Sequence, residues 1–253
     1  MRDIAPHGGP GGRWLHRAGD GPVTVLAHRG GDGPWRENTL EAFAGALAAG
    51  ADGVELDVRR SADGALVVVH DAEIPGVGAL HELPRGALPP WVPSLADALG
   101  ACAGAVVNVE VKNLPTEPGF DPGEQVAADL AAALAATTPD GAAPAGVVVS
   151  SFWTGTLAAL RDAGSPVARG LLVHPSLDAR AVLDAAADLG CRALHPHWSQ
   201  VDRRLVGEAH DRGLAVVTWT VNGEEELAAV LDAGVDVVIT DAVGPVLSRL
   251  GRG

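Results

Sequence analysis

The stretch that decides the fold is GADGVELDVRRSADGALVVVHD, residues 50–71. Two apolar runs within it, Val54–Val58 and Leu66–Val69, are separated only by RRSADGA. Parallel strands need a crossover of a dozen or more residues, so these two runs must pair antiparallel, with the turn at Asp63–Gly64. The sequence therefore predicts a hairpin whose return arm brings His70 back to the carboxyl end of the first arm.

On either side of this hairpin, β-branched runs alternate with alanine-rich stretches of helical character. The predicted parallel strands are Val23–His28, Val54–Val58, Val106–Val111, Val147–Ser151, Arg169–Val173, Ala193–His195, Ala215–Val221 and Val235–Thr240. The predicted helices are Thr39–Ala49, Glu124–Thr137, Thr154–Ala163, Ala179–Leu189, Asp202–Arg212 and Glu224–Ala233. Strands that are apolar almost throughout are typical of a parallel sheet buried on both faces.

Eight parallel strands are the number that closes a barrel. The predicted fold class is therefore α/β, a (β/α)8 TIM barrel with a β-hairpin inserted after the second strand, and a doubly wound open sheet is the alternative. The Pro- and Gly-rich segment 71–93 is predicted to be a loop over one mouth. Residues 1–21 read as an N-terminal tail, and 22–253 as a single barrel domain.

Bulk composition narrows the possible partners. The formal charge of −14 disfavours nucleic acid and anionic membranes as partners, because both carry phosphate charge. No apolar run approaches the roughly 20 residues that span a bilayer, so no stable membrane insertion is expected. The N-terminal segment lacks the apolar core of a secretory signal, and Cys102 and Cys191 read as buried free thiols, so the expected location is the cytoplasm.

Ionisable side chains gather where the predicted strands end, the edge at which barrel enzymes place their functional residues. These residues are His28, Arg29, Glu55, Asp57, His70, Asp71, Glu110 and Lys112. Residues two apart on a strand share a face, so Glu55 and Asp57 point into the barrel together, as do Glu110 and Lys112. Lys112 is the single lysine among 18 basic residues, which suggests a place that needs a compact point charge.

Three carboxylates directed into one cavity repel each other unless a cation binds between them. An all-oxygen set favours one hard divalent metal ion, Mg²⁺ or Ca²⁺, over zinc. The alternative is that Glu55, Asp57 and Glu110 pair with arginines in a purely structural network.

Seven segments of the sequence form a recognisable set: AHRGG at 27–31, ENTLEAF at 37–43, GADGVELDVRRSADGALVVVHD at 50–71, VEVKN at 109–113, SSF at 150–152, TWTVN at 218–222 and GVDVVITD at 234–241. In these segments the sequence resembles the glycerophosphodiester phosphodiesterase family. They follow the family's order from the first strand to the last, so the resemblance covers nearly everything after the tail.

The resemblance implies metal-dependent hydrolysis of glycerophosphodiesters to a glycerol phosphate and an alcohol. It implies His28 and His70 as general acid and base, and Glu55, Asp57 and Glu110 as metal ligands. Arg29 and Lys112 match the residues that hold the phosphate, and Phe152 and Trp219 match aromatic residues beside the organic part of a small-molecule phosphodiester substrate. Glu37 and Asn38 match supporting residues, with Thr39 expected to cap the first helix.

Four other polar residues near the predicted strand ends are expected to have structural roles. We expect His195 and His197 to be structural, Asp71 to cap its loop rather than orient His70, and Asp241 to form a hydrogen bond or cap a helix. The chain also departs from the family at two places. Arg36 stands where the family usually has proline, and the segment after HD is shortened, so selectivity is expected to differ.

Three alternatives stay open at this point. One is a phospholipase D-like lyase that forms a cyclic phosphate from a lysophospholipid-type substrate with the same residues. Another is Schiff-base chemistry at Lys112, and the third is a barrel that binds a ligand without catalysis. The motifs choose neither the alcohol of the substrate nor between Mg²⁺ and Ca²⁺, and they predict no oligomeric state.

Overall fold

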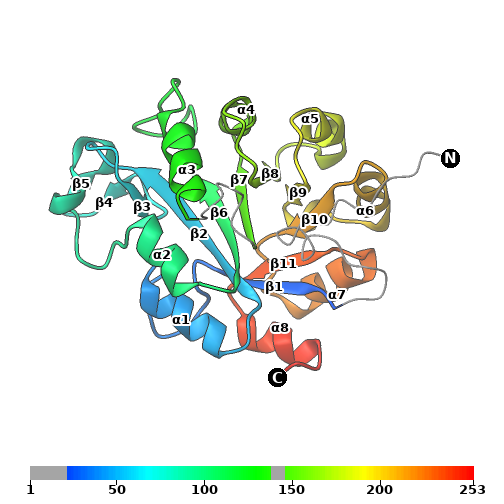
Figure 1. Cartoon of the computed structure of the whole chain (residues 1–253). Coiled ribbons are helices and arrows are strands. Elements are labelled where there is room, and N and C mark those ends of the chain that lie inside the picture. The colour runs from blue at the N-terminus through cyan, green and yellow to red at the C-terminus, as the bar shows by residue number, and fades with distance from the viewer. Residues whose placement is uncertain (1–21, 138–145) are drawn as a thin grey trace.

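The predicted barrel is confirmed in the computed structural model, which describes residues 22–137 and 146–253. Eight parallel strands form a closed ring, because β1 pairs with both β2 and β11 (Figure 1). They are β1 (Thr24–His28), β2 (Gly53–Arg60), β6 (Val106–Val111), β7 (Val147–Ser151), β8 (Ala168–Val173), β9 (Ala193–Pro196), β10 (Ala215–Thr218) and β11 (Val237–Thr240). The predicted tail, 1–21, lies outside the described residues, and the single domain over 22–253 stays a prediction.

The inserted hairpin is also confirmed. Strand β3 (Leu66–Val68) pairs antiparallel with β2, with Val58 opposite Val68. Gly64, at φ +85°, makes the turn, and the side chain of Ser61 donates to Asp63 Oδ1 at 2.6 Å. Past the paired residues, the Val69 amide donates to the Asp57 carbonyl at 2.9 Å. The next residue, His70, therefore lies beside Asp57, close to Val58, where the strand predicted from the sequence ends.

Helices lie around the outside of the ring (Figure 1). Their bounds are α1 (Leu40–Ala48), α2 (Leu95–Ala101), α3 (Gln125–Ala135), α4 (Thr154–Asp162), α5 (Leu183–Asp188), α6 (Arg203–His210), α7 (Glu224–Ala233) and α8 (Val243–Arg249). Thr39 caps α1 as predicted, accepting a hydrogen bond from the Ala42 amide. The sequence prediction missed α2 and α8, and it extended β10 to Val221, three residues too far.

The segment after the hairpin is not the plain loop that the sequence predicted. It contains a short antiparallel ribbon, β4 (Glu73–Ile74) with β5 (Gly78–Ala79), and two 3-10 turns, η1 (Leu80–Glu82) and η2 (Arg85–Ala87). An apolar cluster fixes this segment to the hairpin, because buried residues of both contribute to it. The cluster consists of Val67, Val69, Ile74, Leu80, Leu88 and Val92.

Besides this cluster, the described residues form a core with two parts. The larger part lies between the strands and the helices, where Phe43, Leu56 and Leu130 are fully buried. The smaller part fills the interior of the barrel with Leu26, Ala193, Ala215, Val217, Val237 and Ile239. Cys102 and Cys191 are buried and free, as predicted. Among the described residues, no helix has the length and apolar character needed to cross a bilayer.

Candidate active site

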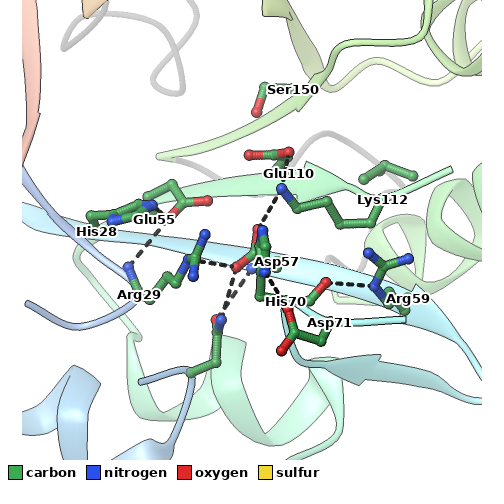
Figure 2. A network of polar contacts seen from close by, with 12 residues as sticks. His28, Arg29, Glu55, Asp57, Arg59, His70, Asp71, Glu110, Lys112 and Ser150 are labelled. Atoms are coloured by element: carbon green, nitrogen blue, oxygen red, sulfur yellow. Dashed lines mark hydrogen bonds and ion pairs between the residues drawn. The ribbon is translucent and has the colours of Figure 1, made fainter. Parts of the chain in front are cut away.

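Three buried carboxylates meet at the carboxyl end of β2 and β6. Glu55 and Asp57 share one face of β2, and the register places Asp57 directly opposite Glu110 of β6. Each of the three offers an oxygen that lies within 4.8 Å of the others (Figure 2). Their relative exposures are 2%, 0% and 8%, so water does little to screen their mutual repulsion. The cluster is one that could hold a metal ion.

Two cations offset part of this negative charge. Lys112 Nζ lies 3.2 Å from Asp57 Oδ1 and is also paired with Glu110. Arg29 Nε lies 3.2 Å from Asp57 Oδ2. Burial alone would raise the pKa of Asp57, but the charges of Lys112 and Arg29 hold it below its ordinary value. Asp57 is therefore the carboxylate that the protein's own cations stabilise in the charged form.

The negative charges of Glu55 and Glu110 are offset less fully by nearby cations than that of Asp57. Burial, reinforced by the charge of Asp57, raises the pKa of Glu55 to about 8. Burial also raises the pKa of Glu110, although Lys112 opposes the shift. Glu55 Oε1 is buried with no hydrogen-bond partner among the described residues. Unpaired buried oxygens are costly, so this part of the cluster is short of positive charge.

The turn after β1 carries the residues that hold Asp57 in place. Asn38 donates from Nδ2 to Asp57 Oδ2 at 2.8 Å and accepts from the Asp57 amide at 3.2 Å. Arg29 and Asn38 have φ of +53° and +57°, a conformation that few residues other than glycine adopt. Gly30, at φ +96°, faces Ala42 of α1 so closely that an added Cβ would lie 2.5 Å from the Ala42 Cβ. Any side chain at Gly30 would push α1 away.

His28 lies at one side of the carboxylate cluster, next to Glu55. Its Nε2 lies 3.9 Å from Glu55 Oε2, and its Nδ1 is 2.7 Å from Asp241 Oδ1. Asn222 donates to the second oxygen of Asp241 at 2.7 Å. Burial lowers the pKa of His28, but the hydrogen bond to Asp241 and the charge of Glu55 outweigh it, so the pKa is raised. Asp241 therefore forms a hydrogen bond, as predicted, and its partner is an imidazole at the site.

His70 lies at the other side, beside Asp57 in Figure 2. Its Nδ1 is 2.7 Å from Asp71 Oδ1, so Asp71 contacts His70 instead of capping the loop, and that sequence prediction was wrong. Arg59 Nε donates to the His70 carbonyl at 2.7 Å, and Arg59 Nη1 donates to Glu117 at 2.9 Å. No motif pointed to the contact between Arg59 and Glu117, because 58 residues separate them in the chain.

An aromatic wall follows β7 and β10. The ring centroids of Phe152 and Trp219 are 5.4 Å apart at 83°, and Lys112 Nζ lies 6.0 Å from the Phe152 centroid. Trp219 Nε1 donates to the His195 carbonyl at 2.8 Å, which fixes the indole. The aromatic wall therefore lies next to Lys112, one of the two cations that contact the carboxylate cluster.

His195 and His197 were expected to be structural residues, and their contacts are consistent with that expectation. His195 is fully buried inside the barrel, where burial lowers its pKa to about 3. His197 caps the 3-10 turn η4 (Trp198–Gln200) through Nδ1, which accepts from the Ser199 amide at 3.3 Å. Neither contacts the three carboxylates through a hydrogen bond or ion pair. The nine residues predicted for the site do lie together, in one group at one barrel mouth.

Fold and site together define a barrel enzyme with an acidic centre flanked by two imidazoles. The profile of the glycerophosphoryl diester phosphodiesterase family matches residues 28–245, so the chain belongs to that family, a family of phosphoric diester hydrolases. The predicted resemblance is confirmed.

Individual relatives can be aligned with this chain over most of their own length. A glycerophosphodiester phosphodiesterase of Caldanaerobacter subterraneus is 27% identical over 239 residues, which cover 86% of this chain and 93% of the relative. One of Bacillus altitudinis is 26% identical over 241 residues, covering 86% and 94%. A phosphodiesterase of Oleispira antarctica, solved in complex with the product sn-glycerol-3-phosphate, has a TM-score of 0.79 and 26% identity, covering 91% of this chain and 97% of that one.

Proposed function

We propose that this chain hydrolyses small-molecule glycerophosphodiesters to a glycerol phosphate and an alcohol, with one divalent cation held by Glu55, Asp57 and Glu110. The observation that carries the proposal is the convergence of these three buried carboxylates within 4.8 Å of one another, beside His28 and His70. The product bound to the Oleispira antarctica relative is chemically consistent with it.

The donor set fits a hard divalent ion. All three groups supply oxygen, the ligand atom that Mg²⁺ and Ca²⁺ prefer. A cation here would give the unpaired Glu55 Oε1 a partner, and its charge would offset the burial that raises the pKa of Glu55 and Glu110. When bound, such an ion supplies a Lewis acid that neutralises charge on phosphate oxygens.

Arg29 and Lys112 are suited to hold the phosphate. Both are anchored by Asp57, so their positions are fixed before substrate arrives. Arg29 keeps a fifth of its side chain exposed, which leaves guanidinium donors for a phosphate oxygen. Preorganised cations of this kind stabilise the charge that develops on phosphorus-bound oxygens during displacement.

The two imidazoles are suited to proton transfer at Nε2. In each, Nδ1 faces a carboxylate, Asp241 for His28 and Asp71 for His70, and a carboxylate favours the tautomer with the proton on Nδ1. That leaves Nε2 free to accept or return a proton. One imidazole takes the proton of the attacking oxygen and the other protonates the departing alkoxide. Phe152 and Trp219 would exclude water beside the organic part of the substrate.

The test is an assay of several glycerophosphodiesters with and without EDTA, followed by addition of Mg²⁺ or Ca²⁺. We expect activity to disappear on chelation, to return with a metal ion, and to be lost in His28→Ala and His70→Ala. Assays in ¹⁸O-water separate hydrolysis from the cyclising lyase reaction, because only hydrolysis places solvent oxygen in the phosphate. Full activity in both folded histidine variants would contradict the assignment.

A further inference from the structure

Arg59 is a buried cation beside the site that the proposed chemistry does not use. It follows Asp57 by two residues, so both side chains lie on the same face of β2. The Arg59 side chain is only 7% exposed, and its Nε donates to the His70 carbonyl at 2.7 Å (Figure 2). A buried guanidinium is costly unless it is paired with an anion. Arg59 therefore needs a carboxylate, and a different part of the chain provides it.

The partner of Arg59 is Glu117, in the β6–α3 loop (residues 112–124). Arg59 Nη1 donates to Glu117 Oε2 at 2.9 Å. The guanidinium thus holds the His70 backbone with one nitrogen and a carboxylate of the β6–α3 loop with another. Because β6 also carries Glu110, this arrangement joins the part of the site on β6 to the part that follows the hairpin.

A cavity of about 140 Å³ lies between the β6–α3 loop and the segment after the hairpin. Its lining includes Pro118 and Gly119 on the side of the loop, and Ala72 and His81 on the side of the hairpin segment. Arg59 also lines it, so the ion pair lies at the edge of the cavity. Where the cavity lies, packing contacts between the two elements are lost. The ion pair therefore provides a connection that side-chain packing does not.

The β6–α3 loop is fixed at its base and along one side. Asn113 donates from Nδ2 to the Asp121 carbonyl and accepts from the Asp121 amide, both at 2.9 Å. The ring of Phe120 meets that of Trp153 edge to face, with the centroids 5.9 Å apart. Glu117 lies between these anchors in the chain, so its carboxylate is held in place.

We propose that Glu117 is a positioning residue for the hydrolysis: through Arg59 it holds the backbone of His70, and so it orients the imidazole toward the substrate. This inference rests on the proposed function. Loss of Glu117 should lower kcat and leave KM nearly unchanged. The reason is that a misplaced proton-transfer group slows the chemical step without removing a contact to the substrate.

The test is the kinetics of Glu117→Ala and Glu117→Gln on a glycerophosphodiester. We expect kcat to fall about fivefold in the alanine variant, with KM within about twofold. Glutamine keeps an oxygen that can accept from Arg59 Nη1, so kcat should return to within about twofold of the unaltered enzyme. Asp129→Ala is the matched control, because Asp129 is 30% exposed against 28% for Glu117 and pairs with Arg60 on the outer surface. It should leave kcat within about twofold.

A double variant shows whether the effect passes through Arg59. Glu117→Ala should cause no further loss of kcat once Arg59→Met is present, because both changes remove the same support of His70. Unchanged kcat in Glu117→Ala would overturn the inference, as would a full additional loss in the double variant.

If Glu117→Ala does not fold, Glu117→Asp replaces it, since aspartate keeps the charge but is one methylene shorter. Its kcat should fall about threefold, and an unchanged kcat would again overturn the inference. Absence of hydrolysis by the unaltered enzyme would instead contradict the proposed function.

Discussion

His28 and Asp241 are 213 residues apart in the chain, and their side chains meet with 2.7 Å between Nδ1 and Oδ1. The contact exists because β1 pairs with β11, with Ala27 opposite Thr240, so the strand ends that carry these residues are neighbours. Closure of the barrel therefore positions one of the two imidazoles.

Replacing Asp241 with asparagine should lower kcat/KM by about ten- to a hundredfold, within the range that proton-transfer groups contribute. The neutral amide no longer stabilises a charged His28, and it no longer selects the tautomer with a free Nε2. Steady-state kinetics on a glycerophosphodiester measures the effect. Asp232→Asn, which alters an exposed ion pair between Asp232 on α7 and Arg203 on α6, should behave like the unaltered enzyme. Equal activity in the two variants would show that Asp241 does not orient His28.

Arg59→Met should reduce kcat/KM about tenfold, because the His70 backbone loses a charge-assisted hydrogen bond at 2.7 Å. The adjacent Arg60 offers a matched control, since its side chain pairs with Asp129 on the outer surface. Arg60→Met should leave activity within about twofold. A loss that is the same in both variants would point to stability as the cause, and melting curves for both would reveal it.

A structural feature was predictable from the sequence where it depends on residues close together in the chain. The hairpin was predictable because RRSADGA is too short for a crossover, a constraint within one segment. Helix α8 was missed because Gly244 and Pro245 interrupt its pattern, although proline is tolerated in a first helical turn. Helix α2 is only seven residues long and follows a Pro-rich stretch, so little periodicity marks it.

The residues of the candidate site fall into the same two groups, those with a local sequence signal and those whose contacts join distant segments. Glu55, Asp57, Glu110 and Lys112 were predictable because strand alternation and shared strand ends fix which way they point. The contacts of Asp241 and Arg59 were not, since each depends on which strands and loops become neighbours in space. The packed segment after the hairpin was also missed, because its apolar residues follow no helix or strand period.

Gly170→Ala should destabilise the protein by about 1–3 kcal/mol, the usual range for overpacking a core. An added Cβ would lie 2.2 Å from His195 Nε2, inside the barrel. Gly207→Ala is a control of opposite sign: nothing lies within 4 Å of that position in α6, so alanine should stabilise the helix by about 0.5–1 kcal/mol. Chemical denaturation measures both. A neutral effect at Gly170 would mean that His195 moves aside freely.

Stability should fall as the pH drops below about 6.5, in part because of His195. Burial lowers the pKa of folded His195 to about 3, whereas the unfolded chain keeps the ordinary value of 6.5. Between these values the unfolded state binds a proton that the folded state excludes, so acid favours unfolding by up to about 1.4 kcal/mol per pH unit. His195→Leu should give a shallower slope of unfolding free energy between pH 6.5 and 5. Parallel curves for the two proteins would contradict this.

The most direct test of the central claim is crystallographic. Crystals grown with Mn²⁺, an anomalously scattering substitute for Mg²⁺, would show where a divalent ion binds. We predict one anomalous peak per chain, within about 2.6 Å of oxygens from Glu55, Asp57 and Glu110. A saturated crystal with no peak at that cluster, or with a peak that excludes any of the three carboxylates, would contradict the account.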